Sequence, residues 1–128
     1  MTGDDLAGLA REAAMLAYAP YSNFRVGAVA VAASGEVYRG ANVENASYPA
    51  SSCAEATAVA NAVSSGVRKL DTVAVACIDA ADIEGAYPCG RCRQIMWEFG
   101  VERVIVTTGS GEVRQHYLAE LLPHGFKL

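Results

Sequence analysis

Two segments decide the interpretation of this sequence: Cys53-Ala54-Glu55 and Pro88-Cys89-Gly90-Arg91-Cys92. Together they contain three of the four cysteines of the chain. Three protein ligands leave the fourth tetrahedral position of a zinc ion open, and this open position distinguishes catalytic zinc sites from closed structural ones. We therefore predict that Cys53, Cys89 and Cys92 bind a single Zn²⁺ and that Glu55, beside the open position, transfers protons.

Both segments begin a predicted helix, at residues 53–65 and 89–99. A helix N-terminus carries a partial positive charge that lowers the pKa of a thiol, which favours the thiolate that zinc requires. Cys89 and Cys92 share one face of their helix, with Cβ atoms roughly 5–6 Å apart. This spacing allows both sulfur atoms to reach the same ion.

The hydrophobic pattern predicts an α/β fold. Two apolar runs on either side of Ser34-Gly35 indicate a β-hairpin. The predicted strands are 26–33, 37–41, 72–78 and 101–107, and the predicted helices are 2–18, 53–65, 89–99 and 117–122. Thr2 and Asp5 resemble a capping box at the start of the first helix. Because helices separate the later strands, we expect parallel pairing with right-handed crossovers and one mixed sheet covered by helices on both faces.

Composition limits the class of protein. The chain has 128 residues and 52% of them are hydrophobic, which suits one domain, residues 1–128, with a core that needs no disulfide bonds. The net charge of −4 and the lack of any run of Lys or Arg argue against a nucleic-acid partner. No apolar run reaches the length of a membrane span, so no membrane partner is expected. A small neutral solute fits better.

The N-terminus and the cysteines together predict a location. Residues 1–5 include two aspartates and do not resemble a secretory signal. Clustered cysteines without such a signal favour free thiols in a reducing compartment over disulfide bonds. We therefore expect a cytoplasmic protein.

The cysteine pattern also admits other sites. Cys89 and Cys92 alone match a redox C-x-x-C pair, but that interpretation leaves Cys53 and Glu55 unexplained. A closed structural zinc site would need a fourth ligand, and the only spare cysteine is Cys77, in an apolar strand.

The histidines are weaker candidates still. His116 and His124 are far along the chain and lack the spacing of metal ligands. We expect both to be surface imidazoles and Cys77 to be a core thiol.

A further ordered set of motifs runs along the chain: Tyr21-Ser22-Asn23-Phe24, Val26-Gly27-Ala28, the run Gly-Ala-Asn-Val-Glu-Asn-Ala-Ser-Tyr at 40–48, Arg93-Gln94, Leu121-Leu122-Pro123 and Phe126. With the two cysteine segments, this set resembles the small zinc-dependent cytidine deaminases, which are homotetramers. The resemblance covers nearly the whole chain. It implies a single three-layer αβα sandwich with a mixed central sheet of about five strands.

The resemblance also implies a reaction. Water adds to C4 of cytosine and ammonia leaves, so cytidine and 2′-deoxycytidine become uridine and 2′-deoxyuridine, as in pyrimidine salvage. Cys53, Cys89 and Cys92 would bind the zinc ion. Glu55 would move protons between water, ring N3 and the leaving ammonia.

Four residues would contact the substrate within one chain. The resemblance implies that Phe24 packs on the pyrimidine, that Asn42 and Glu44 bind the ribose 3′-hydroxyl, and that the Ala54 N–H contacts the base carbonyl. From residue type alone, Phe24 also suits a core position, and Asn42 and Glu44 also suit a polar loop.

Three more residues would act between subunits. Ala46 and Tyr48 would reach the sugar 5′ end in a neighbouring site, and Phe126 would close a neighbour's pocket. The resemblance therefore implies a homotetramer with shared active sites and a small nucleoside as the ligand.

Two positions depart from the family pattern. Many members carry Arg directly after the Cys-Ala-Glu triplet, where it hydrogen-bonds the cysteine sulfurs, and here the residue is Ala56. Three thiolates leave a Zn²⁺ site with a net negative charge that nearby donors normally offset. We predict that Arg91 takes this role and offsets the charge of the thiolates. The segment 49–52 also replaces the usual glycine-led apolar run, beside the expected intersubunit contact.

Two other functions remain open. One is deamination of a modified cytosine nucleoside such as blasticidin S, although Phe24 and the motif at 42–45 favour the plain nucleoside. The other is a non-catalytic zinc-binding assembly domain. Ala56 gives this second alternative some support, whereas Glu55 argues against it because a structural site has no use for that carboxylate.

Overall fold

The computed structural model describes all 128 residues. Five strands form one sheet in the order β2-β1-β3-β4-β5. The strands are β1 (Val26–Ala32), β2 (Val37–Ala41), β3 (Leu70–Cys77), β4 (Arg103–Thr108) and β5 (Val113–Tyr117). The helices are α1 (Gly3–Ala14), α2 (Ala54–Ser64), α3 (Gly90–Glu98) and α4 (Leu118–Leu121), with short 3₁₀ helices η1 (Tyr48–Ala50) and η2 (Ile83–Ala86). No helix has the length and apolar character needed to cross a membrane.

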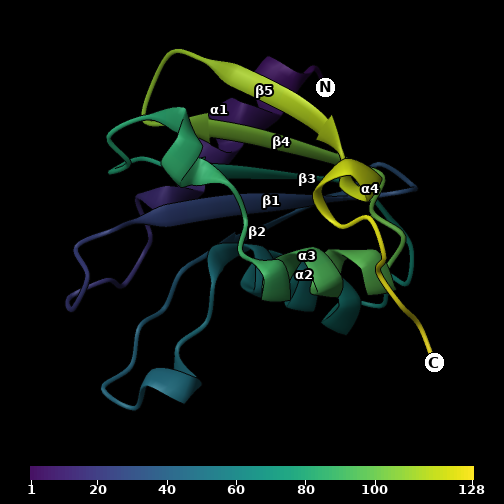
Figure 1. Ribbon diagram of the computed structural model, residues 1–128, viewed down its shortest axis with the longest axis horizontal. Coiled ribbons are helices and arrows are strands. Elements are labelled where there is room, and N and C mark those ends of the chain that lie inside the picture. The colour runs from purple at the N-terminus through teal and green to yellow at the C-terminus, as the bar shows by residue number, and fades with distance from the viewer.

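The sheet is covered on both faces, as the sequence predicts (Figure 1). α1 packs on one face, where its Leu6 and Ala10 join a small cluster with side chains of β1, β3 and β4. α2 and α3 pack on the other face over the larger core. Alternate residues of each strand serve the two clusters, because successive strand side chains point to opposite faces. The prediction of an α/β sandwich with about five strands is confirmed.

The sheet is mixed, as expected, and the structure shows which strand pairs are parallel and which are antiparallel. β1 and β2 form the predicted antiparallel hairpin, and β3 and β4 pair in parallel. β3 joins β1 in an antiparallel arrangement, because the connection through α2 crosses over β1. The first four strands differ from their predicted bounds by no more than a few residues.

Two expectations about the chain's ends are wrong. The helix predicted over 2–18 begins with the expected capping box but ends at Ala14. It ends early because Tyr18 pairs with the segment after β2: its N–H donates to Asn42 O at 2.9 Å, and its carbonyl accepts from Glu44 N at 2.8 Å. The pattern also missed β5, since its residues Val-Arg-Gln-His-Tyr form a polar edge strand without an apolar run.

Small residues let α2 lie directly on the sheet. A Cβ atom at Gly40 in β2 would lie 2.3 Å from Ala58 N and 2.7 Å from Ala54 O, both in the backbone of α2. Such distances are far below van der Waals contact. The glycine therefore sets how closely α2 approaches the sheet, and α2 carries Glu55.

Gly40→Ala is expected to displace α2 and to lower the free energy of unfolding by about 3 kcal/mol, since backbone atoms cannot move aside as a flexible side chain can. Urea unfolding followed by circular dichroism measures the change. Gly8→Ala in α1 is the matched control, because a Cβ at Gly8 meets nothing within 4 Å and alanine favours the helix. Equal stability of Gly40→Ala and the unaltered protein would contradict this packing argument.

Candidate active site

The first residues of α2 and α3 bring three cysteines together. Cys53 is the N-cap of α2, Cys89 is the N-cap of α3, and Cys92 lies in the first turn of α3. Their Sγ atoms all lie within 4.8 Å of one another. Around a tetrahedral zinc ion with Zn–S bonds of about 2.3 Å, sulfur atoms lie roughly 3.8 Å apart. The three thiols therefore fit a zinc ion after a small mutual approach.

The surroundings of Cys53 favour loss of its proton. Hydrogen bonds from Cys92 and Cys89 and the positive charge of Arg91 lower the pKa of Cys53 to about 6, although burial acts in the opposite direction. The pKa of Cys92 is raised, because its thiol donates to Cys53 and is buried. A thiolate at Cys53 near neutral pH is the form in which cysteine binds zinc.

Glu55 is the second residue of α2, and only 5% of its surface is exposed. Burial raises the pKa of its carboxyl to about 7, and the charge of Cys53 acts in the same direction. A carboxyl with a pKa near the working pH can accept a proton in one step and return it in another. Its position is therefore suited to proton transfer beside the three sulfur atoms.

A pocket of about 260 Å³ opens over this cluster. Four of the predicted substrate contacts line it: Phe24, Asn42, Glu44 and Ala54. The other lining residues are Val26, Ser51, Ser52, Cys53, Glu55, Cys77, Gly85, Tyr87 and Cys89. Cys92 is fully buried and does not line it. The pocket thus joins the cysteine cluster to side chains from both ends of the β1–β2 hairpin.

Asn42 and Glu44 organise one wall of the pocket. The Asn42 amide accepts a hydrogen bond from Val26 N at 2.9 Å and donates one to Phe24 O at 2.8 Å. The Glu44 carboxylate accepts from the backbone N–H groups of Tyr21 and Ser22 and from the Ser22 hydroxyl. These bonds hold the pKa of Glu44 low, mainly through the Ser22 hydroxyl. Both side chains keep free lone pairs for a ligand.

Three predicted contacts lie outside this pocket: Ala46, Tyr48 and Phe126. Tyr48 is 76% exposed and Phe126 is 64% exposed. Their segments, around η1 and at the C-terminus, extend from different corners of the chain (Figure 1). Within one chain these residues have no contact with the cysteine cluster's pocket.

Comparison with known proteins identifies the family. Residues 3–108 match the family described as "Cytidine and deoxycytidylate deaminase zinc-binding region". The chain belongs to this deaminase family. It is 42% identical to the cytidine deaminase of Sporosarcina psychrophila, over 98% of this chain and 92% of that protein. It is also 42% identical to the cytidine deaminase of Mycobacterium tuberculosis strain H37Rv, over 96% of this chain and 88% of that protein.

Solved structures agree with this assignment. The crystal structure of cytidine deaminase from Burkholderia pseudomallei superposes with a TM-score of 0.89 at 43% identity, covering 98% of this chain and all of the other. That of the Mycobacterium tuberculosis cytidine deaminase gives a TM-score of 0.81 at 39% identity, covering 100% of this chain and 99% of the other. The deaminase family binds zinc, and the three-cysteine cluster can hold the metal ion here.

The position of Arg91 is compatible with the predicted compensation for Ala56. Both residues line one groove between α2 and α3. The Arg91 guanidinium helps to lower the pKa of Cys53, through its charge and a hydrogen bond. This geometry supports the hypothesis that, in this deaminase, Arg91 offsets the negative charge of the thiolates.

Arg91→Ala is therefore expected to weaken zinc affinity by roughly 10-fold, the lower end of the effect of removing a group that supports metal ligands. Competition with a chromophoric chelator measures it, together with the pH–rate profile. Arg68→Ala is the matched control, because Arg68 lines the same groove but bonds to backbone carbonyls of Val63 and Val67. Unchanged zinc affinity and an unchanged profile in Arg91→Ala would refute the hypothesis.

The pocket is also lined by residues that the sequence analysis did not predict as substrate contacts. Cys77 is a buried thiol as expected, but it lines the pocket as well. Burial raises the pKa of Cys77 to about 12, so it stays protonated and is a poor fourth ligand. Ser51 and Ser52, from the segment that departs from the family pattern, line the pocket too.

Tyr87 is the other missed residue, and it corrects the expectation for His116. His116 is half-buried rather than a surface imidazole, and its Nε2 lies 2.8 Å from the Tyr87 hydroxyl. No local motif marks this pair, because β5 itself was missed. His124 is exposed, as expected.

Proposed function

We propose that the chain is a zinc-dependent deaminase that hydrolyses cytidine and 2′-deoxycytidine to uridine and 2′-deoxyuridine, as in pyrimidine salvage. One observation carries the proposal: the buried Glu55 lies beside three sulfur atoms that are within 4.8 Å of one another, in a pocket large enough for a small solute. A structural zinc site has no need of such a carboxylate. Relatives that match almost the whole chain are named cytidine deaminases.

The metal ligands and the proton carrier have separate roles. Cys53, Cys89 and Cys92 would hold the zinc ion, which supplies Lewis acidity when bound. Glu55 accepts a proton from the attacking water and delivers it to ring N3. It then takes the remaining proton from the hydroxyl added at C4 and passes it to the amino group, so the C4–N bond breaks, ammonia leaves and a carbonyl forms at C4. Its raised pKa suits both directions of transfer near neutral pH.

The pocket walls fit a nucleoside. The Phe24 ring offers a flat apolar face for the pyrimidine. Asn42 and Glu44 can receive a sugar hydroxyl with the lone pairs that their backbone contacts leave free. The N–H of Ala54, the first residue of α2, has no acceptor within the helix and can donate to the base carbonyl.

The test is a parallel assay of cytidine, 2′-deoxycytidine, cytosine and blasticidin S with protein of known zinc content. The reaction is monitored through the decrease in the absorbance of the cytosine ring. We expect turnover of both nucleosides and none of free cytosine, because the base alone lacks the sugar contacts. Turnover of blasticidin S alone would favour the modified-nucleoside alternative. Bound zinc without turnover of any of these compounds would favour the assembly domain.

We also propose a homotetramer with shared sites. Ala46, Tyr48 and Phe126 lie outside the pocket of their own chain, and the two aromatic side chains are largely exposed. Their roles therefore need a second copy of the chain.

Residues 1–128 would act as one domain, since all five strands share a sheet. Cytoplasmic location stays a prediction.

Subunit mixing tests the shared site. Phe126→Ala and Glu55→Gln chains should each be impaired alone. When they are co-expressed, a pocket with an intact Glu55 receives Phe126 from its neighbour, so activity should exceed the sum of the two homomers. Full activity of Phe126→Ala alone, or no gain on mixing, would show that Phe126 serves no neighbouring site. Light scattering reports the number of subunits.

A further inference from the structure

The pocket has a second aromatic side chain besides Phe24. Tyr87 connects η2 to Pro88 and the ligand Cys89, and it lines the pocket. Among the lining residues, only Phe24 and Tyr87 carry aromatic rings. Aromatic faces are the surfaces on which a flat base binds well. Tyr87 is therefore a candidate contact for the base.

The two aromatic residues belong to, or are hydrogen-bonded to, elements on opposite sides of β3. Phe24 leads into β1, and its carbonyl is bonded to Asn42 at the end of β2. The Tyr87 hydroxyl is hydrogen-bonded to His116 of β5, the strand at the other edge of the sheet. Cys77, at the end of β3, lines the pocket between these two flanks. An aromatic residue thus stands on each flank of the pocket.

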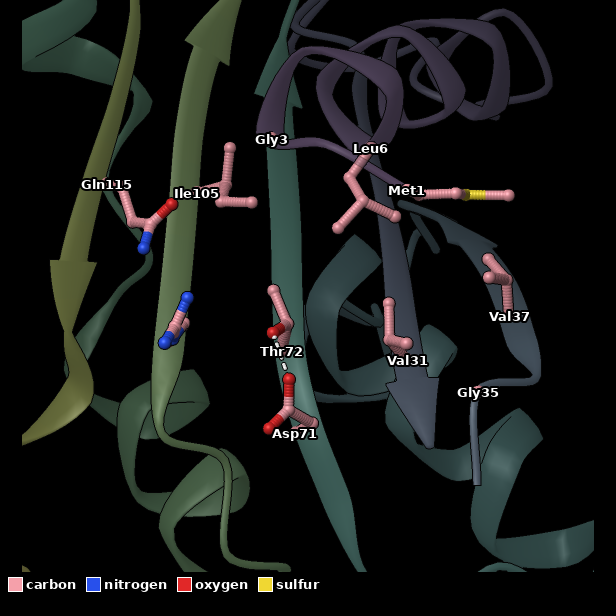
Figure 2. A pocket seen from close by; sticks show the side chains of 11 residues that line it. Met1, Gly3, Leu6, Val31, Gly35, Val37, Asp71, Thr72, Ile105 and Gln115 are labelled. Carbon is pink, nitrogen blue, oxygen red and sulfur yellow. Dashed lines mark hydrogen bonds between the residues drawn. The ribbon is translucent and has the colours of Figure 1, made fainter. Parts of the chain in front are cut away.

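The Tyr87 ring is held by two side chains of β5. Its hydroxyl lies 2.8 Å from His116 Nε2, and Arg114 Nη1 donates to it at 3.3 Å. The Tyr87 and His116 rings have centroids 5.3 Å apart at 57°. Arg114 and His116 are two residues apart in β5, so both side chains point to the same face of the sheet. Gln115, between them, lies beside Ile105 in a separate pocket on the α1 face (Figure 2).

Arg114 extends this attachment to η2. It bonds to the Glu84 carboxylate of η2 at 2.7 Å and to Glu112, just before β5, also at 2.7 Å. These exposed ion pairs add little stability individually. Together, however, they direct the guanidinium toward the Tyr87 hydroxyl. The segment 84–87 is therefore fastened to the edge strand by side chains alone.

We propose that Tyr87 forms the second aromatic wall of the nucleoside pocket and that His116 and Arg114 are positioning residues that fix its ring. The inference rests on the proposed function. A ring held by its hydroxyl loses little further freedom when a base stacks on it, so the wall is preorganised for binding. The role belongs to substrate affinity more than to the chemical step.

Tyr87 variants test the wall. Tyr87→Leu is expected to raise KM for cytidine and to weaken calorimetric binding of the product uridine roughly 10-fold, because a base–aromatic stack is lost, with a smaller change in kcat. Tyr87→Phe keeps the ring but removes the hydroxyl that contacts His116 and Arg114, so the ring is no longer fixed. A rise of about 3-fold in KM is therefore expected. Zinc content is measured for each variant, since Cys89 is two residues away.

His116→Ala and Arg114→Ala test the positioning. Each should raise KM about 3-fold alone and add nothing in a Tyr87→Phe background, because residues that act through one contact are not additive. Gln115→Ala is the matched control, since it alters the same strand on the opposite face and should leave KM unchanged. A residue that merely stabilised β5 would produce no such non-additivity.

The outcomes separate the two proposals. If the unaltered protein deaminates cytidine but Tyr87→Leu keeps KM and uridine affinity within about 2-fold, the wall is refuted and the function stands. The positioning role is refuted if His116→Ala raises KM by the same factor in the unaltered protein and in the Tyr87→Phe variant. It is also refuted if the rises in KM follow the zinc content alone. If the unaltered protein neither deaminates cytidine nor binds uridine, the proposed function fails and this inference fails with it.

Discussion

Glu55→Gln is expected to lower kcat for cytidine by about 10³-fold or more, while zinc content and circular dichroism stay unchanged. Glutamine has nearly the same shape as glutamate, so α2 and the pocket should persist. Its amide cannot accept a proton from water or pass one to the leaving amino group. Steady-state kinetics, zinc analysis and circular dichroism on the same preparation measure the three quantities.

The control for this change is Glu12→Gln. Glu12 is an exposed carboxylate of α1, far from the pocket lining, and the variant should keep full activity. A Glu55→Gln protein with kcat within about 10-fold of the unaltered value would show that another group carries the proton. Loss of zinc together with activity would instead mean that Glu55 supports the metal site.

Cys92→Ala is expected to abolish stoichiometric zinc binding and turnover together, with zinc affinity falling by roughly 10³-fold or more. Cys92 is the fully buried member of the cluster, so no water replaces it easily as a ligand. Treatment of the unaltered protein with a chelator should reproduce the loss of activity, and added zinc should restore it. Metal analysis after gel filtration and the absorbance assay provide the two readouts.

Cys77→Ala is the matched control for that cysteine substitution. Cys77 lines the same pocket, but its thiol has a raised pKa and donates to Ala86 O rather than facing the cluster. The variant should bind zinc with the normal stoichiometry. Full zinc binding by Cys92→Ala, or loss of zinc from Cys77→Ala, would show that the ligand set is wrong.

Local sequence patterns were sufficient for the parts of the fold that have strong periodicity. Apolar runs located β1 to β4, and the helices that begin at the cysteine segments lie within a residue or two of their predicted bounds. β5 has only one aliphatic residue, Val113, and is stabilised by pairing with β4, so its own pattern resembles a loop. The early end of α1 likewise depends on the pairing of Tyr18 with a distant segment.

The site divides in the same way. Spacing alone indicated that Cys89 and Cys92 share a helix face and that Glu55 follows Cys53. Their meeting depends on how α2 and α3 pack on the sheet, and the resemblance implied it before the structure did. The contact between Tyr87 and His116 was not predicted, because it joins the segment before α3 to a strand that the pattern missed.

The roles of Ala46, Tyr48 and Phe126 could not be judged within one chain. Each lies outside the pocket, and each is exposed, so a single copy places no substrate atom near it. A resemblance to an assembled enzyme implies contacts that only the assembly contains. Their contributions therefore stay predictions until the mixed oligomers are assayed.

The most direct test of the central claim is mass spectrometry of the product formed from cytidine in water labelled with heavy oxygen, by zinc-loaded protein, with ammonia measured in parallel. We expect uridine with a single heavy oxygen atom at C4 and one ammonia released per uridine. Cytidine recovered unchanged, or a product without the label, would contradict hydrolytic deamination at this pocket.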